Sequence, residues 1–174
     1  ASAAKLELQA ATSVTAGKQL DLLVTVHNQI SGHNLPTGTT FIRELWLEVT
    51  ATDGDGKVLY RTGDVDGNGD LRGHFSALDP YGDADLLQFS ATLLDAGGNP
   101  VLFPWRAVEL RSNAIPPLYA RSYTLFVPTK SATTGPIAVH ARLRFRTHAP
   151  YLLRALGLPE LVDDTPIYDI ASAD

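Results

Sequence analysis

The sequence predicts an all-β protein, an antiparallel β-sandwich with long loops and one short helix near its C-terminal end. Apolar and polar residues alternate with the period of a strand in several segments, most clearly in residues 20–28, 41–50 and 137–146. Turns rich in Gly, Asp, Asn and Pro separate these segments. A chain of 174 residues that is 44% hydrophobic can bury one sizeable core. We therefore expect a sandwich domain over residues 1–147, followed by a short helix and an extended tail over residues 148–174.

The composition restricts the chemistry that is open to this chain. The sequence has no cysteine, which excludes disulfides, covalent c-type haem attachment, thiolate metal sites and cysteine nucleophiles. A net charge of -5 argues against a nucleic-acid partner, and no apolar run approaches the roughly 18 residues that span a bilayer. Methionine is also absent, and residues 1–4, Ala-Ser-Ala-Ala, are the small residues expected after signal-peptidase cleavage. We expect a processed, periplasmic or extracellular chain, either a free subunit or a piece of a larger protein.

The first strands follow from the alternation. Residues 5–11 alternate weakly and predict an edge strand, whereas residues 20–28 predict a strand with a buried face. That face carries Leu20, Leu22, Val24 and Val26. Residues 41–50 predict the next strand, in which Leu45, Leu47 and Val49 share one face and Glu44, Trp46 and Glu48 the other. Trp46 is then either covered by the insertion that follows or exposed as an anchor for a partner.

The connection between the second and third strands is residues 32–38, Gly-His-Asn-Leu-Pro-Thr-Gly. A tight hairpin needs only a couple of residues, so this connection is an ordered loop whose shape is set by its glycines and by Pro36. It presents His33. The imidazole of His33 either hydrogen-bonds the backbone of the loop or contacts something outside the chain.

Residues 53–56, Asp-Gly-Asp-Gly, predict a hairpin turn before a return strand over residues 57–61. The next segment matches the first half of a calcium loop, because oxygen donors alternate and a glycine stands at the sixth position. The donors are Asp64, Asp66, Asn68 and Asp70. The match fails at the twelfth position, Phe75, where a glutamate would be required. Either Asp79, Asp83 or Asp85 completes a calcium shell, or the segment is a turn held by its own side chains.

The second half of the chain alternates less regularly. Residues 72–85 predict a surface excursion that carries His74, and strand character resumes over residues 86–94. Residues 101–110 contain two short apolar runs broken by a proline. Residues 119–127 predict a strand whose core face carries Tyr123, Leu125 and Val127.

The strand predicted over residues 137–146 has a cationic face opposite its apolar one. This face carries His140, Arg142, Arg144 and Arg146. Like charges in a row repel one another, so we expect opposing carboxylates. These come either from Glu44 and Glu48 within the chain or from a docked partner. Residues 151–157 then predict one or two helical turns closed by glycine, and the tail either packs over the sandwich or reaches a neighbour.

Several of these segments together resemble a known family. They are residues 32–38, 43–47 and 53–63, with Ile-Pro-Pro at 115–117, Phe-Val-Pro at 126–128 and Ala-Arg-Leu-Arg-Phe-Arg at 141–146. They resemble the immunoglobulin-like β-sandwich region found at the end of many exported multihaem c-type cytochromes. The likeness spans most of the chain, and Gly-His-x-x-Pro-Thr-Gly is its most specific part. The chain departs from the family in having no Cys-x-x-Cys-His motif.

The resemblance implies a non-catalytic, exported interaction module associated with a multihaem c-type cytochrome, in an electron-transfer complex or a filament. Its partner would be that cytochrome or another subunit of an extracytoplasmic complex, whose haems it would dock to or shield. The histidines that would contact such a haem, or ligate its iron in trans, are His33, His74 and His148. The expected docking surface, suited to haem propionates, consists of Trp46, His140, Arg142, Arg144 and Arg146.

Two other functions remain open. A calcium-dependent adhesive or assembly domain would use the donors of residues 64–70 to order a contact surface. A copper-binding sandwich would lack the cysteine and methionine ligands that are usual in electron-transfer sites. We expect no enzyme, because no catalytic elbow, zinc-binding helix, phosphate loop or dinucleotide fingerprint occurs in the sequence.

Overall fold

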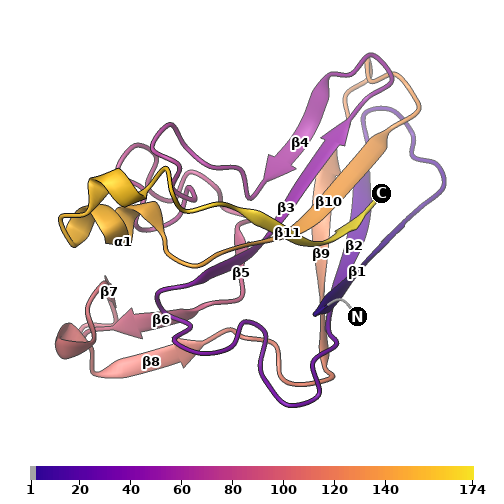
Figure 1. Ribbon diagram of the computed structural model, residues 1–174. Helices are drawn as coiled ribbons and strands as arrows, with labels where there is room; N and C mark the ends of the chain where they lie inside the picture. Colours follow the sequence, from indigo (N-terminus) through magenta and orange to yellow (C-terminus); the bar gives the residue numbers. More distant parts are fainter. Residues whose placement is uncertain (1–2) are drawn as a thin grey trace.

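The computed structural model describes residues 3–174, in which the strands form three antiparallel sheets (Figure 1). The first two of the small residues at 1–4 lie outside the described part. One sheet has the order β1-β2-β9. Its strands are β1 (Ala4–Ala10), β2 (Gln19–Asn28) and β9 (Ala120–Pro128).

The second and larger sheet has the order β11-β10-β3-β4, and the short β5 also pairs with β3. Its strands are β3 (Glu44–Thr52), β4 (Val58–Thr62), β5 (Leu87–Gln88), β10 (Ala138–Arg146) and β11 (Tyr168–Ala173). The third sheet lies apart from these two (Figure 1). It consists of β6 (Ala91–Leu94), β7 (Pro100–Val101) and β8 (Glu109–Ser112), in the order β7-β6-β8.

The apolar faces of the two larger sheets form one core, which confirms the predicted all-β, sandwich-like fold. Leu22, Val24 and Val26 of β2 are at most 1% exposed, and Leu45, Leu47 and Val49 of β3 are fully buried. β9 adds Leu125 and Val127, and β10 adds Ala141 and Leu143. Burial of each large aliphatic side chain stabilises the fold by about 1.5–3 kcal/mol.

The helical content is small. α1 (Pro150–Ala155) follows β10, and the glycine predicted to close it, Gly157, has φ 76°. Two short 3-10 helices, η1 (Pro104–Arg106) and η2 (Pro159–Leu161), complete the structure. Within residues 3–174 no helix is long and apolar enough to cross a bilayer.

Two elements differ from their prediction. The strand expected over residues 86–94 is divided into β5 and β6, which belong to different sheets. The division occurs at Phe89 and Ser90, where the Phe89 N–H donates to the Leu45 carbonyl at 2.8 Å and the Ser90 hydroxyl donates to the Arg43 carbonyl at 2.7 Å. The expected extended tail forms β11, which pairs along β10 and so belongs to the sandwich.

Candidate functional site

The loop of residues 32–38 is held by Asn28, a buried residue at the end of β2. The Asn28 side-chain amide donates to the carbonyl oxygens of His33 and Ile115, both at 2.9 Å. Leu35 and Ile115 also form an isolated antiparallel bridge, with N-to-O distances of 2.9 and 2.8 Å. The loop is therefore ordered, as its length and glycines predicted. Sequence reasoning missed the role of Asn28, although an asparagine directly before a long loop is a typical bracing residue.

The far end of the same loop is held by Arg43. Its Nη1 donates to the Thr37 carbonyl at 2.6 Å. Gly38 has φ 78°, and a Cβ there would lie 3.2 Å from the Arg43 guanidinium. The backbone conformation therefore favours glycine, and a side chain at this position would also have to displace the Arg43 guanidinium slightly.

The imidazole of His33 is exposed, although its backbone carbonyl is tied to Asn28. Among residues 3–174 no group hydrogen-bonds the His33 ring. In contrast, the rings of His27, His74 and His140 pair with Glu7, Tyr81 and Asp174. The predicted hydrogen bond from the ring to the backbone of the loop is therefore not formed, and contact with a molecule outside the chain stays a prediction.

The structure does not gather the predicted histidines into one site. His33 lines a shallow surface hollow with Ser112 and Pro117, whereas His74 lines a different pocket. His148 is exposed shortly before α1. In the described part of the chain, no group of three or more His, Cys, Asp or Glu side chains is placed to hold a metal ion.

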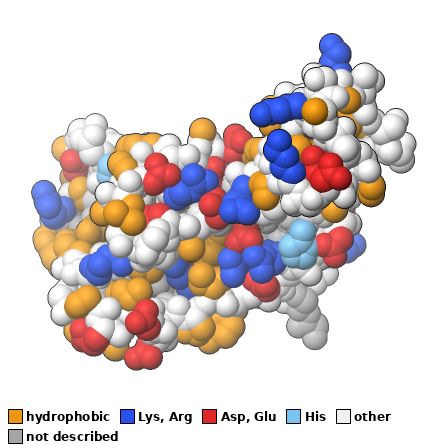
Figure 2. Space-filling view, turned by 90° about the horizontal axis from the view of Figure 1, so that it is seen from above, with side chains coloured by type: hydrophobic (Ala, Val, Ile, Leu, Met, Phe, Trp, Pro, Cys, Tyr) orange, Lys and Arg blue, Asp and Glu red, His pale blue; other side chains and the backbone are white. Residues whose placement is uncertain are grey.

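The cationic row on β10 is neutralised within the chain, so the predicted docking surface requires correction. The register opposes Arg142 to Glu48 and Arg146 to Glu44, and both pairs form ion pairs. Arg144 also pairs with Glu48. Asp169 of β11 adds ion pairs to Arg142 and Arg144, at 3.4 and 3.1 Å. Figure 2 shows positive and negative side chains interspersed over this face of the molecule.

Trp46 and Arg146, two members of that predicted surface, are in fact buried. Trp46 is fully buried, and its Nε1 donates to the Gly63 carbonyl at 2.9 Å. The guanidinium carbons of Arg144 and Arg146 lie 5.8 and 5.3 Å from the indole centroid. The insertion after β4 therefore covers Trp46, and neither Trp46 nor Arg146 is available to a partner.

The predicted calcium donors have other partners. Asp64 pairs with Arg72 at 2.6 Å, and the buried Asp70 pairs with Arg154. Asp66 accepts from the backbone N–H groups of Asn68 and Asp70 at 2.7 and 3.0 Å. Because these carboxylates point to separate internal partners, the residues do not fit a calcium ion in this conformation.

The three aspartates proposed to complete the calcium shell serve other purposes. Asp79 binds Arg72, and Asp85 accepts from the Tyr60 hydroxyl at 2.9 Å. Asp83 accepts from the Thr62 hydroxyl at 3.0 Å and from the Gly63 N–H at 2.7 Å. The segment is thus the alternative that the sequence left open, a turn region held by its own side chains.

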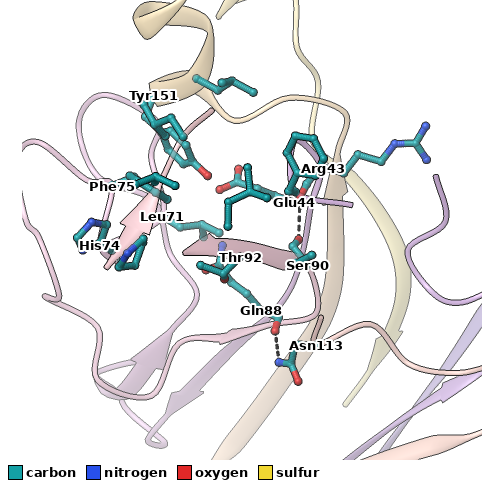
Figure 3. Close-up of a pocket in the computed structure, with 18 residues that line it drawn as sticks. Arg43, Glu44, Leu71, His74, Phe75, Gln88, Ser90, Thr92, Asn113 and Tyr151 are labelled. Carbon is teal, nitrogen blue, oxygen red and sulfur yellow. Dashed lines mark hydrogen bonds between the residues drawn. The ribbon is translucent and has the colours of Figure 1, made fainter. Parts of the chain in front are cut away.

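A pocket of about 210 Å³ lies between the excursion after β4, the start of β3, the third sheet and α1 (Figure 3). Glu44 lines it with a side chain that is only 3% exposed. Glu44 Oε2 binds Arg146, but Oε1 has no hydrogen-bond partner among the described residues. Burial raises the pKa of Glu44. The charge and hydrogen bond of Arg146 act in the opposite direction, but the pKa stays above its ordinary value.

Tyr151 forms the opposite wall of this pocket. Its ring stacks on Phe75 with centroids 4.7 Å apart, and its hydroxyl points toward the Glu44 carboxylate (Figure 3). Burial, and then the charge of Glu44, raise the pKa of Tyr151. Sequence reasoning missed this pocket, because it joins residues more than a hundred positions apart.

Comparison with known proteins supports the fold. No family model matches the chain, and no curated protein matches it. A solved structure, that of a penta-haem cytochrome c552 from Thermochromatium tepidum, matches with a TM-score of 0.64 and 22% sequence identity. The match covers 98% of this chain and 38% of that one. The chain therefore shares its fold with part of a multihaem cytochrome.

Proposed function

We propose that this chain is a non-catalytic, exported module that docks against a multihaem c-type cytochrome, and that His33 contacts a haem of that partner. The observation that carries the proposal is an exposed imidazole, without a partner among the described residues, on a loop braced by Asn28 and Arg43. The fold shared with part of a penta-haem cytochrome supports it.

The loop suits such a contact physically. A neutral imidazole is a competent ligand for haem iron, and it can equally pack against the haem edge. Bracing by backbone hydrogen bonds holds the loop before any partner arrives, which lowers the entropy lost on binding. The 174 residues contain no cysteine to attach a haem covalently, so in this proposal the haem is one that the cytochrome carries.

The contact surface in this proposal is the hollow around His33, in place of the arginine row. The hollow includes Asn34, Ser112 and Pro117. The residues that line it take no part in the ion pairs of Glu48 with Arg142 and Arg144, which are already complete within the chain.

The test is purification of the tagged chain from its own host under native conditions, followed by native mass spectrometry and optical spectroscopy. A haem-bearing companion with a low-spin c-type spectrum is expected. His33→Ala should lose the companion or change the low-spin signature, whereas His148→Ala, which replaces an exposed histidine elsewhere, should not. A companion without haem would overturn the function. An unchanged spectrum and yield in His33→Ala would overturn the role of His33.

A further inference from the structure

The pocket between β3, the third sheet and α1 has the features of a ligand site. Glu44 Oε1 is a buried carboxylate oxygen without a hydrogen-bond donor, on a side chain that is 97% shielded from solvent. Buried polar atoms are nearly always satisfied, so an exception on a residue that lines a pocket leaves a place for a donor from outside the chain. The hydroxyls of Tyr151 and Thr92 also line the pocket, and no described residue hydrogen-bonds either of them.

The charges around the pocket favour a neutral ligand. Glu44 is already balanced by Arg146, and the nearby Asp70 is balanced by Arg154. A cation would therefore enter a region with no net negative charge left to attract it. A neutral donor can satisfy Glu44 Oε1 without disturbing either ion pair.

The walls of the pocket favour a ring. Phe75 and Tyr151 present stacked aromatic rings, and Phe41, Leu71 and Leu152 add apolar surface. The volume is about 210 Å³, whereas an engineered apolar cavity of roughly 150 Å³ is enough to hold benzene. A single six-membered ring with one or two small substituents fits this space.

We infer that this pocket binds a small neutral ring compound that carries a hydroxyl group, with the hydroxyl hydrogen-bonded to Glu44 Oε1. A hydroxyl both donates and accepts, so the same group can also accept from Tyr151. The site is separate from the His33 loop and does not depend on the function proposed for that loop.

The inference is tested with phenol and toluene, two rings of nearly the same size of which only phenol donates. Binding to the full chain is measured by calorimetry and by ligand-observed NMR. Phenol should bind saturably. Toluene should bind about tenfold more weakly or worse, because it leaves the carboxylate oxygen unsatisfied. Equal binding of the two rings, or no saturable binding of phenol, would overturn the inference.

Three variants locate the binding site without removing Glu44, whose loss would leave Arg146 unpaired. Thr92→Phe fills the pocket from β6 and should abolish phenol binding. Thr124→Phe places the same bulk on the exposed face of β9 and should not change it. Tyr151→Phe keeps the stacked ring and should weaken binding a few-fold. Unchanged phenol binding in Thr92→Phe, with circular dichroism confirming the fold, would contradict the proposed location.

Discussion

Glu44 and Arg146 form a buried ion pair on the charged face of the larger sheet. Both side chains are 3% exposed, and the Arg146 Nη1 also donates to the Gly69 carbonyl at 2.6 Å. Trp46 lies between Glu44 and Glu48 in the sequence of β3. The guanidinium groups of Arg144 and Arg146 lie near its ring. These residues form an internal polar layer beneath the insertion, which explains why alternate positions of two neighbouring strands are charged.

Arg146→Ala should lower the free energy of unfolding by about 3–5 kcal/mol, because it leaves the carboxylate of Glu44 buried and unpaired. Urea denaturation followed by fluorescence measures the change. Arg111→Ala is the matched control, since the pair of Arg111 with Glu109 is 68% and 51% exposed. Arg111→Ala should lower the free energy of unfolding by about 0–1 kcal/mol. Equal costs in the two variants would contradict the assignment of an internal layer.

Gly63 occupies a position that leaves no room for a side chain. It has φ 74°, and a Cβ there would lie 2.2 Å from the Leu47 carbonyl oxygen. Gly63→Ala should therefore cost clearly more than the roughly 1–2 kcal/mol of left-handed backbone strain alone. Gly56→Ala is the control, because Gly56 has φ 77° but open space around its Cα. A similar urea midpoint for the two variants would refute the steric explanation.

At the scale of elements, the segment after β4 organises itself around Asp66. The Ser76 hydroxyl donates to the Asp66 carboxylate at 2.6 Å, in addition to the two backbone N–H groups. Val65 and Leu71 form a bridge across the same turn. The segment is thus held together by its own side chains and backbone, and it forms the cover of Trp46 and one wall of the pocket.

Calcium at millimolar concentration should leave the thermal midpoint unchanged, because the carboxylates of Asp64 and Asp70 already bind arginines. Differential scanning fluorimetry with calcium and with chelator measures this. Magnesium at the same ionic strength is the control for general salt effects. A rise specific to calcium would show that the segment rearranges into a metal site.

The acid stability of this segment should depend on Asp66. Burial raises the pKa of Asp66. The hydrogen bonds from Ser76 and from the backbone of Asn68 and Asp70 together lower it by more, so the net pKa lies below its ordinary value. A carboxyl whose folded pKa is depressed contributes stability above its unfolded pKa, and that contribution is lost as pH falls. Asp66→Asn should therefore flatten the loss of stability below about pH 4. Asp163→Asn, at an exposed position, should leave the profile unchanged.

At the scale of the whole molecule, β11 is the edge strand of the larger sheet, beside β10. It pairs along β10 from Ala141 to Phe145, and Asp169 binds two of the arginines on that strand. β11 also lies near β1 of the other sheet. The strand therefore both protects the edge of β10 and helps to join the two sheets.

Removal of residues 167–174 should lower the urea midpoint and promote self-association, because it exposes the edge of β10 and unpairs Arg142 and Arg144 from Asp169. Denaturation and size-exclusion chromatography with light scattering measure the two effects. Removal of Asp174 alone, which gives up only its exposed contact with His140, is the control. A shortened chain that stays monomeric with the original midpoint would show that β11 is dispensable.

Much of the sandwich can be predicted from local sequence patterns. The alternation in residues 20–28, 41–50 and 137–146 identified the buried faces of β2, β3 and β10, and it also anticipated Glu44 and Glu48 as partners of the arginines. These features are predictable because side-chain direction in a strand has period two wherever the strand lies. The ordered loop around His33 was predictable for a similar reason, since glycine and proline restrict the backbone locally.

The sequence by itself therefore determined the fold class, the faces of the main strands and the absence of a covalently bound haem. Only the tertiary structure decided that Trp46 is buried, that the calcium-like donors bind arginines, that the tail becomes β11, and that Glu44 and Tyr151 share a pocket. Each of these depends on contacts between segments remote from one another in the chain. Such contacts depend on the packing and charge balance of the whole molecule. A local sequence pattern carries no information about either.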